Sequence, residues 1–329
     1  LEAEERELVK GLIVNKFRGD INLFEDGVRI LEERGDAPVL GVVPYLHHLF
    51  IPEEDAVAIE SPPPSQPSPR AASSKEGEGG SEIEIAVIRL PRIANFDDFD
   101  PLSAEPGVRV RYVDAPEDLG DPAAIIIPGT KSTMNDLAWM HATKLADAIQ
   151  RHAKKGCAVV GICGGYQMLG ENIHDPEHVE STKDSAPGLS LLPTETTFIG
   201  EKATHRAKAE VHHGAGWLSS LKGQPLSGYE IHMGRTESAS PWLAINERSG
   251  EPVRVLDGAS SDDGKMWGCY VHGLFANKNL RRAWLQSLGW QEDVATENEN
   301  PFAASLTRLA DTLESTLNMD LLEKIIWEN

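Results

Sequence analysis

Short, almost uninterrupted apolar runs that alternate with helical stretches constrain the fold of this chain more than any other feature. Between two of these runs, residues 134–156 have helical spacing and stop at Gly156. Strands that are apolar along their whole length are buried on both faces, which is typical of a parallel sheet covered by helices. The sequence therefore predicts an α/β fold with a mostly parallel sheet flanked by helices. The strand-like runs are 84–90, 108–113, 123–129 and 157–162.

The later part of the chain has a different pattern. Between about 207 and 275 the strand-like runs are shorter and glycines are more frequent, which predicts antiparallel strands added near a site. Residues 305–328 carry apolar side chains at helical spacing and predict one amphipathic closing helix.

A small β-α-β unit precedes this region. Residues 11–17 and 38–45 are strand-like, and residues 21–35 between them have helical spacing. One such unit is too small for a domain, so we expect the end of a larger α/β domain here. The stretch that follows is rich in Pro, Ser, Gly and charge, and a stretch with so little to bury predicts a flexible linker. The predicted organisation is a domain remnant at 1–60, a linker at 61–81 and a larger domain at 82–329.

Charge and cysteine content exclude several classes of partner. The 329 residues hold 31 Lys plus Arg against 52 Asp plus Glu, a formal net charge of −21. An anionic surface repels phosphate backbones and anionic headgroups, so neither nucleic acid nor a membrane is predicted as a partner. The three cysteines cannot all pair and show no C-x-x-C spacing. We therefore predict a cytoplasmic protein with reduced thiols and no bound metal.

The stretch AVVGICGGYQMLGE, residues 158–171, sets a cysteine in a glycine-rich turn between a strand and a helix. This is the layout of a nucleophile elbow, with Cys163 in the place of the usual serine. Glycines beside it, among them Gly164 and Gly165, allow close backbone approach or positive φ. The helix N-terminus favours a thiolate, and its N–H groups can receive an oxyanion. The alternative is a buried structural cysteine, which we expect for Cys157 in its strand.

A thiol nucleophile needs a base, and two histidines stand just before a glycine turn. His272 ends the strand-like segment of WGCYVHGLFAN, and His232 lies in GYEIHMGRTE, residues 228–237. A lone histidine beside a strand is more often structural than catalytic, but the cysteine elbow favours His272 as the base. We expect the second segment to line the pocket, with His232 or Glu230 within reach of the thiol.

The loop in IIIPGTKSTMNDL, residues 125–137, follows a neighbouring strand and precedes a helix. The carboxyl ends of parallel strands meet at one edge of a sheet, so this loop is expected beside the elbow. Gly129 and its neighbours could then supply the second half of an oxyanion hole. The alternative is a simple helix cap by Ser132 or Thr133.

Eight stretches, in order along the chain, resemble the cobyric acid synthase family of glutamine-dependent amidating enzymes. The resemblance implies a class I-like glutamine amidotransferase fold, with Cys163 as nucleophile and His272 as catalytic histidine. It also implies amidation of the b, d, e and g carboxylates of adenosylcobyrinic acid a,c-diamide, with glutamine and ATP. The stretches are VNKFRGD, VLGVVPYL, IAVIRLPRIANFDDFDPL, IIPGTKSTMNDL, GICGGYQMLGE, GLSLLPTETTF, GYEIHMGRTE and YVHGLF.

The family joins an ATP-dependent synthetase domain to the amidotransferase domain, and its phosphate-binding loop is absent from this sequence. The resemblance therefore implies that residues 1–60 are the end of the synthetase domain, which would be a partner of the rest. On this analogy Asn15 and Pro44 approach the adenine of ATP. ATP and Mg²⁺ are implied for the complete synthetase, and no cofactor is implied for the amidotransferase domain.

Related interpretations remain open. The a,c-diamide synthase performs the same chemistry on an earlier substrate. The stretch IRLPRIANFDDFDPL favours cobyric acid synthase, as do Tyr166 and Gln167 after the elbow, which we expect at the substrate. More distant alternatives are a cell-wall amidating partner, a catalytically silent binding module and a cysteine peptidase of similar fold.

The residue that orients His272 cannot follow the usual pattern of such amidotransferases. They carry His-x-Glu, whereas the residue two positions after His272 is Leu274. We therefore expect a backbone carbonyl or a polar group from elsewhere, with no carboxylate at the outer ring nitrogen, and consequently slow glutamine hydrolysis.

Overall fold

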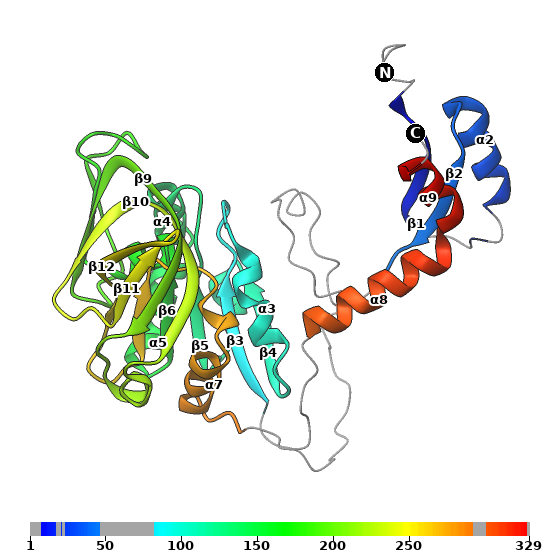
Figure 1. Cartoon of the computed structure of the whole chain (residues 1–329). Helices are drawn as coiled ribbons and strands as arrows, with labels where there is room; N and C mark the ends of the chain where they lie inside the picture. Colours follow the sequence, from blue (N-terminus) through cyan, green and yellow to red (C-terminus); the bar gives the residue numbers. More distant parts are fainter. Residues whose placement is uncertain (1–7, 18–20, 22–23, 47–81, 292–300, 328–329) are drawn as a thin grey trace. The chain divides into compact units, whose positions relative to one another are not determined.

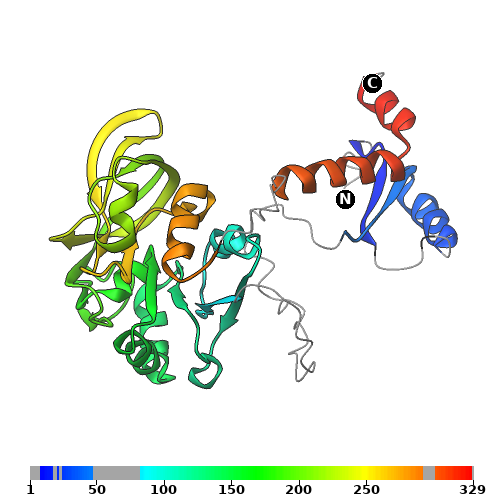
Figure 2. The same ribbon diagram turned by 90° about the horizontal axis from the view of Figure 1, so that it is seen from below.

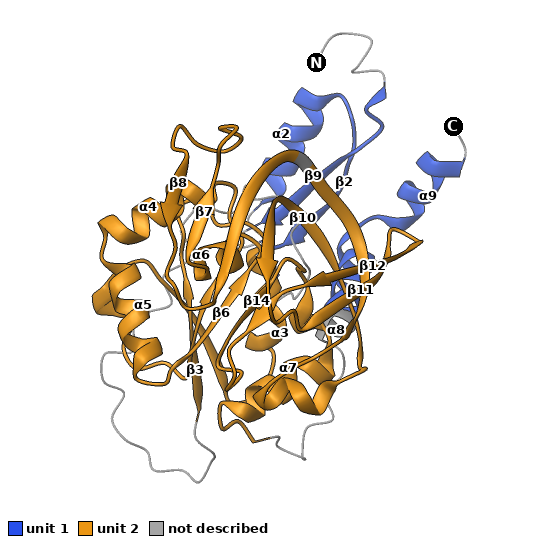
Figure 3. Cartoon of the chain, turned by 90° about the vertical axis from the view of Figure 1, so that its left-hand side faces the viewer, with its two compact units in different colours: residues 1–53, 295–329 blue, residues 54–294 orange. Residues whose placement is uncertain are grey.

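The computed structural model describes residues 8–17, 21, 24–46, 82–291 and 301–327, and the predicted linker at 61–81 lies outside them. The chain divides into two compact units (Figure 3). The smaller comprises residues 1–53 together with 295–329, and the larger comprises residues 54–294. Each unit is described by itself.

The smaller unit contains the predicted β-α-β arrangement. Strand β1 (Leu12–Phe17) pairs in parallel with β2 (Val39–Pro44), and α2 (Glu25–Gly35) connects them. Two further helices, α8 (Pro301–Thr316) and α9 (Met319–Trp327), contact β2 (Figure 2).

The closing helix predicted at 305–328 is therefore wrong in two respects. It is two helices, because the chain between them bonds to a strand: the Asn318 N–H donates to the Leu40 carbonyl at 2.7 Å, and Leu317 bridges Gly41. These helices also belong with residues 1–53, so the compact larger unit ends near 294 and does not extend to 329 as predicted.

The larger unit is built on a six-stranded sheet in the order β13-β14-β6-β5-β3-β4. All its pairings are parallel except that of the edge strand β13, which confirms the predicted mostly parallel sheet. The strands are β3 (Ile83–Ile88), β4 (Val108–Val113), β5 (Ala124–Ile127), β6 (Ala158–Ile162), β13 (Ala259–Ser260) and β14 (Met266–Cys269).

Side chains that alternate along the strands form separate cores on the two faces of this sheet. Ile85 and Val87 belong to one core, whereas Ala86 and Ile88 belong to the other. Helices α4 (Thr133–Ala142), α5 (Leu145–Lys154) and α6 (Gly164–Leu169) contribute to the second core. The first core is completed by α7 (Lys278–Ser287) and by strands of another sheet. Helices thus cover one face, and a helix with a second sheet covers the other.

The helix predicted at 134–156 is also two helices. Lys144 adopts φ 67°, in the left-handed region, at the start of α5. The Thr143 hydroxyl donates to the Trp139 and Met140 carbonyls, which satisfies the end of α4. Neither residue is glycine or proline, so no strong local signal marks this break.

The second sheet has the order β12-β11-β9-β7-β8, with β10 paired to β9. Strands β9, β10, β11 and β12 of this sheet are labelled in Figure 1. Its pairings are antiparallel, as predicted, apart from β7 with β9. However, β9 has 18 residues and β10 has 14, so the prediction of short strands is wrong for these two. The strands are β7 (Asn172–His174), β8 (Ser185–Pro187), β9 (Thr194–Val211), β10 (Pro225–Ser238), β11 (Leu243–Arg248) and β12 (Glu251–Asp257).

We predict that residues 82–294 fold without the rest of the chain, because both helices beyond residue 294 contact β2 of the smaller unit. The shortened chain should unfold cooperatively in calorimetry. Its melting temperature should lie within about 4 °C of the larger unit's transition in the whole chain, a difference on the order of 1 kcal/mol. An insoluble or molten product would show that the boundary is misplaced.

Candidate active site

Cys163 stands on a sharp turn at the carboxyl end of β6. Its φ of 52° and ψ of −110° are unusual for a residue with a side chain, and α6 begins at the next residue. The Cys163 N–H donates to the Cys269 carbonyl of the neighbouring strand at 2.9 Å, and its own carbonyl accepts from the Gln167 N–H at 3.1 Å. Such backbone strain persists only where surrounding contacts hold it, and it concentrates at functional sites.

The glycines around the elbow are required by close backbone approach. A Cβ atom at Gly161 would lie 2.6 Å from the Gly165 backbone, and one at Gly164 would lie 2.8 Å from the Thr130 side chain. At Gly165 it would overlap the Ile127 carbonyl. None of these three glycines is among those with positive φ, so the positive φ falls on the cysteine itself.

His272 and a carboxylate form the second part of the site. His272 follows β14, and its Nδ1 lies 2.7 Å from Oδ2 of Asp98 in the 3-10 helix η3 (Phe96–Phe99). The other oxygen, Oδ1, accepts from the Gly273 N–H at 2.8 Å. His272 is 1% exposed and Asp98 is 6% exposed. The imidazole is therefore held by a buried, fully engaged carboxylate.

The prediction that no carboxylate orients His272 is wrong, and the slow hydrolysis expected from it loses its basis. Asp98 precedes His272 by 174 positions, whereas the His-x-Glu pattern places the orienting carboxylate only two positions after the histidine. The signal was the acidic cluster FDDFD at 96–100, between a strand and the rest of the site. The sequence alone does not say which of its aspartates points inward.

The charges around His272 favour its imidazolium form. Burial acts to lower the pKa of His272, but the negative charges of Cys163 and Asp98 and their hydrogen bonds to the ring outweigh it. Together they raise the pKa to about 10. An imidazole that is influenced by Cys163 and hydrogen-bonded to Asp98 has the arrangement of a nucleophile, base and orienting acid.

The predicted loop and the β10 segment both reach this site. A Cβ atom at Gly129 would lie 2.9 Å from Cε1 of His272, so the loop borders the imidazole. The Cys163 thiol donates to the Ile231 carbonyl of β10 at 3.3 Å. The alternative role of the loop, a cap of α4 by its own hydroxyls, is not seen among the described contacts. Instead the Glu180 carboxylate accepts from the Thr133 N–H at 2.5 Å at the start of α4.

Glu230 and His232 are engaged in a buried network. Glu230 is 1% exposed and accepts from Arg248 at 2.7 and 2.8 Å. Burial acts to raise the pKa of Glu230, but hydrogen bonds from His232 and Arg248 and their charges lower it overall. His232 stacks on Tyr270 with 3.8 Å between ring centroids, and its Nδ1 lies 2.9 Å from the Gly234 carbonyl. The described contacts tie both residues into this network, and a role at the substrate stays a prediction.

Tyr166 and Gln167 lie within α6 and are almost fully buried. Tyr166 packs edge-on against Tyr270, with 5.5 Å between centroids. The Gln167 amide accepts from the Thr133 hydroxyl at 2.9 Å and donates to the Tyr270 hydroxyl at 3.2 Å. These contacts hold α6, the helix that follows the elbow, against its neighbours. Substrate contact by either remains a prediction.

The two residues predicted near a nucleotide lie in the smaller unit. Asn15 is exposed on β1, where its side chain accepts from the Lys16 N–H at 2.8 Å. Pro44 ends β2 and pairs with Phe17, so both lie toward the carboxyl ends of neighbouring parallel strands. Nucleotide binding there stays a prediction.

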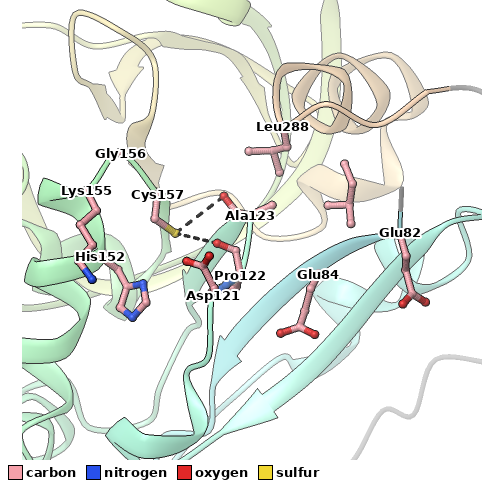
Figure 4. Close-up of a pocket in the computed structure, with 11 residues that line it drawn as sticks. Glu82, Glu84, Asp121, Pro122, Ala123, His152, Lys155, Gly156, Cys157 and Leu288 are labelled. Atoms are coloured by element: carbon pink, nitrogen blue, oxygen red, sulfur yellow. Dashed lines mark hydrogen bonds between the residues drawn. The ribbon is translucent and has the colours of Figure 1, made fainter. Parts of the chain in front are cut away.

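Cys157, near the same sheet, has the environment of a structural thiol and provides a comparison for Cys163 (Figure 4). It lies before β6, and its thiol donates to the Pro122 carbonyl at 3.3 Å. Burial, with the charge of Asp121, raises its pKa to about 11. It lines a cavity of about 410 Å³ together with Glu82 and Glu84. This cavity is at the amino ends of the strands, the opposite edge from Cys163, and the thiol has the contacts of a structural cysteine.

Residues 84–280 match the family model described as the CobB/CobQ-like glutamine amidotransferase domain. The chain is 47% identical over 329 residues to a cobyric acid synthase of Herpetosiphon aurantiacus, with 99% of this chain and 62% of the relative covered. It is 48% identical over 328 residues to a cobyric acid synthase of Chloroflexus aggregans, with the same coverage. The solved PurLQS of Thermotoga maritima is similar with a TM-score of 0.48 and 20% identity, covering 63% of this chain and 97% of that one. The chain thus spans about 62% of the length of these curated relatives.

Within the described residues, no helix is both long enough and apolar enough to span a bilayer.

We predict that Asp98→Asn lowers the pKa of His272 below its value of about 10. A raised pKa contributes stability that is fully present below pH 6.5 and is lost as the pH rises through about 10. The variant should therefore be less stable by about 1.5–3 kcal/mol near pH 6, with the difference closing above pH 10. Denaturant unfolding at several pH values measures this difference. Asp97→Asn is the matched control, because no described hydrogen bond joins Asp97 to His272. An equal effect in both variants would contradict the assignment.

We also predict that Gly165→Ala destabilises the fold by about 1–3 kcal/mol or more, because its Cβ meets backbone that cannot rotate away. Gly200→Ala should have a much smaller effect, since nothing lies within 4 Å of the place that its Cβ would take. Urea unfolding of both variants provides the comparison, and equal stabilities would rule out the close approach of α6 to β5.

Proposed function

Because the chain belongs to the family of CobB/CobQ-like glutamine amidotransferase domains, we propose that it hydrolyses glutamine to glutamate and ammonia at Cys163. The single observation that carries this proposal is the buried bond between Asp98 and His272 beside a cysteine with positive φ. Backbone strain clusters at functional sites, and a binding module without catalysis does not require a strained cysteine beside an imidazolium and its orienting carboxylate. This proposal therefore favours an enzyme over a scaffold.

The first half of the reaction forms a thioester. The Cys163 sulfur attacks the side-chain amide carbon of glutamine, a C–S bond forms, and the carbonyl electron pair moves to oxygen. The oxyanion is held by backbone N–H groups of Gly164 or Gly165 and of the Gly129 loop, which border the thiol and the ring. When the intermediate collapses, the C–N bond breaks and the departing nitrogen takes a proton from His272, leaving as ammonia.

The second half releases glutamate. His272, now neutral, accepts a proton from water, whose oxygen attacks the thioester carbon. The C–S bond breaks, and the thiolate and imidazolium are restored. Asp98 holds the same ring nitrogen throughout, because its two oxygens are engaged by the ring and by the Gly273 N–H. The ring therefore exchanges protons only at its other nitrogen.

The whole protein's activity goes further than this chain. We propose that the ammonia amidates the b, d, e and g carboxylates of adenosylcobyrinic acid a,c-diamide, as the name and resemblance of the relatives suggest. ATP, with Mg²⁺, would activate each carboxylate in the synthetase domain, and Asn15 and Pro44 would lie near its adenine. Support comes from 47% identity along 99% of this chain.

We predict that Cys163→Ala abolishes glutamine use and leaves ammonia use intact. The replacement removes the nucleophile without adding bulk, so the elbow still folds. In a protein that includes the synthetase domain, the variant should amidate the corrinoid from ammonium salts at the wild-type rate and give no product from glutamine.

Product analysis by mass spectrometry measures both reactions. Glutamine-dependent product from the variant would refute Cys163 as the nucleophile. Loss of the ammonia-dependent reaction as well would assign Cys163 a structural role instead.

A further inference from the structure

Tyr229 of β10 lies against His272 through both its ring and its backbone. The ring centroids are 5.1 Å apart and the planes differ by 15°, which is a stacked arrangement. The two backbones also exchange hydrogen bonds: the His272 N–H donates to the Tyr229 carbonyl at 2.8 Å, and the Tyr229 N–H donates to the His272 carbonyl at 3.2 Å. This strand bridge fixes the backbones of the two residues against each other, and the rings stack from that base.

The Tyr229 ring is fixed at its far end as well. Its hydroxyl oxygen accepts from Nδ2 of Asn95 at 2.7 Å. Asn95 has φ 54° and directly precedes η3, the short helix that carries Asp98. The same element thus holds the carboxylate against one edge of the imidazole and the phenol against its face.

Tyr229 also borders a cavity of about 1000 Å³. It is lined by Tyr229 and Gly273, with Arg206 and Lys208 among its polar residues. His272 does not line it and is 1% exposed. The side chains of Arg206 and Tyr229 share one face of the sheet, because the two residues are register partners on β9 and β10. Tyr229 therefore contacts both this cavity and the buried imidazole, which does not itself line the cavity.

We propose that Tyr229 is a positioning residue for glutamine hydrolysis, holding the plane of His272 and keeping cavity water from its imidazolium. This inference rests on the proposed function, since it concerns the same histidine. The groups that face His272 from the surrounding elements are Asp98 and Asp97 of η3, Cys163 of the elbow and Tyr229 itself.

The chemistry of the phenol suits this role. Burial, followed by the charges of Asp98 and Asp97, raises the pKa of Tyr229, so the ring stays neutral over the working pH range. An aromatic face attracts a cation, most strongly where water is excluded. A neutral ring stacked on the imidazolium thus favours the protonated form that must donate to ammonia.

The test uses the 329-residue chain and 6-diazo-5-oxo-L-norleucine, a glutamine analogue that alkylates an activated thiol. The labelling rate of Cys163, followed by mass spectrometry from pH 6 to 11, should fall on the alkaline side near the pKa of His272, about 10 in the wild type. In Tyr229→Leu we expect this alkaline limb to move down by about 0.4 to 1.5 pH units. Tyr229→Phe, which keeps the stack and loses the bond to Asn95, should keep the limb close to its wild-type position.

The outcomes separate the two proposals. A wild-type chain that is folded but not labelled at Cys163 would refute the proposed function. Normal wild-type labelling with an unshifted limb in Tyr229→Leu would refute the role of Tyr229 alone, as would an equal shift in Tyr229→Phe. If the leucine variant does not fold by circular dichroism, Tyr229→Met takes its place, because it fills similar space without a ring.

Discussion

Helix α6 runs so close to the ends of β5 and β6 that a Cβ atom has no room at Gly161 or Gly165. This close approach turns the chain sharply after β6 and forces positive φ on Cys163. The strain is balanced by the dense cores on both faces of the parallel sheet, where strand residues such as Ile125 and Val160 are fully buried. A side chain that would be ordinary in a strand is thereby raised to the edge of the sheet, where neighbouring strands end.

The electrostatics of the site follow from burial. An isolated imidazolium with 1% exposure would lose its proton, because burial penalises the charged form. Asp98 and Cys163 reverse that outcome, and Asp98 is itself compensated by the Gly273 N–H. Each charge is therefore tolerable only in the presence of the others. Removing one member of such a group is more damaging than its individual hydrogen bond suggests.

The parallel sheet, the elbow and the pair of Cys163 and His272 could be predicted because local patterns carry them. Continuous apolar runs mark buried strands, and glycines mark close backbone approach. Asp98 and Tyr229 could not be predicted in this way. The first is one of several aspartates in a single cluster, and the second meets His272 through a long-range backbone bridge between β10 and the chain after β14. The predicted boundary of the larger unit was wrong for a similar reason, because the contact of residues 317–318 with β2 is long-range.

The separation of 174 positions between Asp98 and His272 also has a consequence for when the site forms during folding. Until η3 and the end of β14 meet, His272 has no carboxylate to hold its ring. Assembly of the larger unit is therefore the event that completes the site around Cys163. A newly made or partly unfolded chain holds Asp98 and His272 apart, so the arrangement around Cys163 exists only in the fully assembled unit.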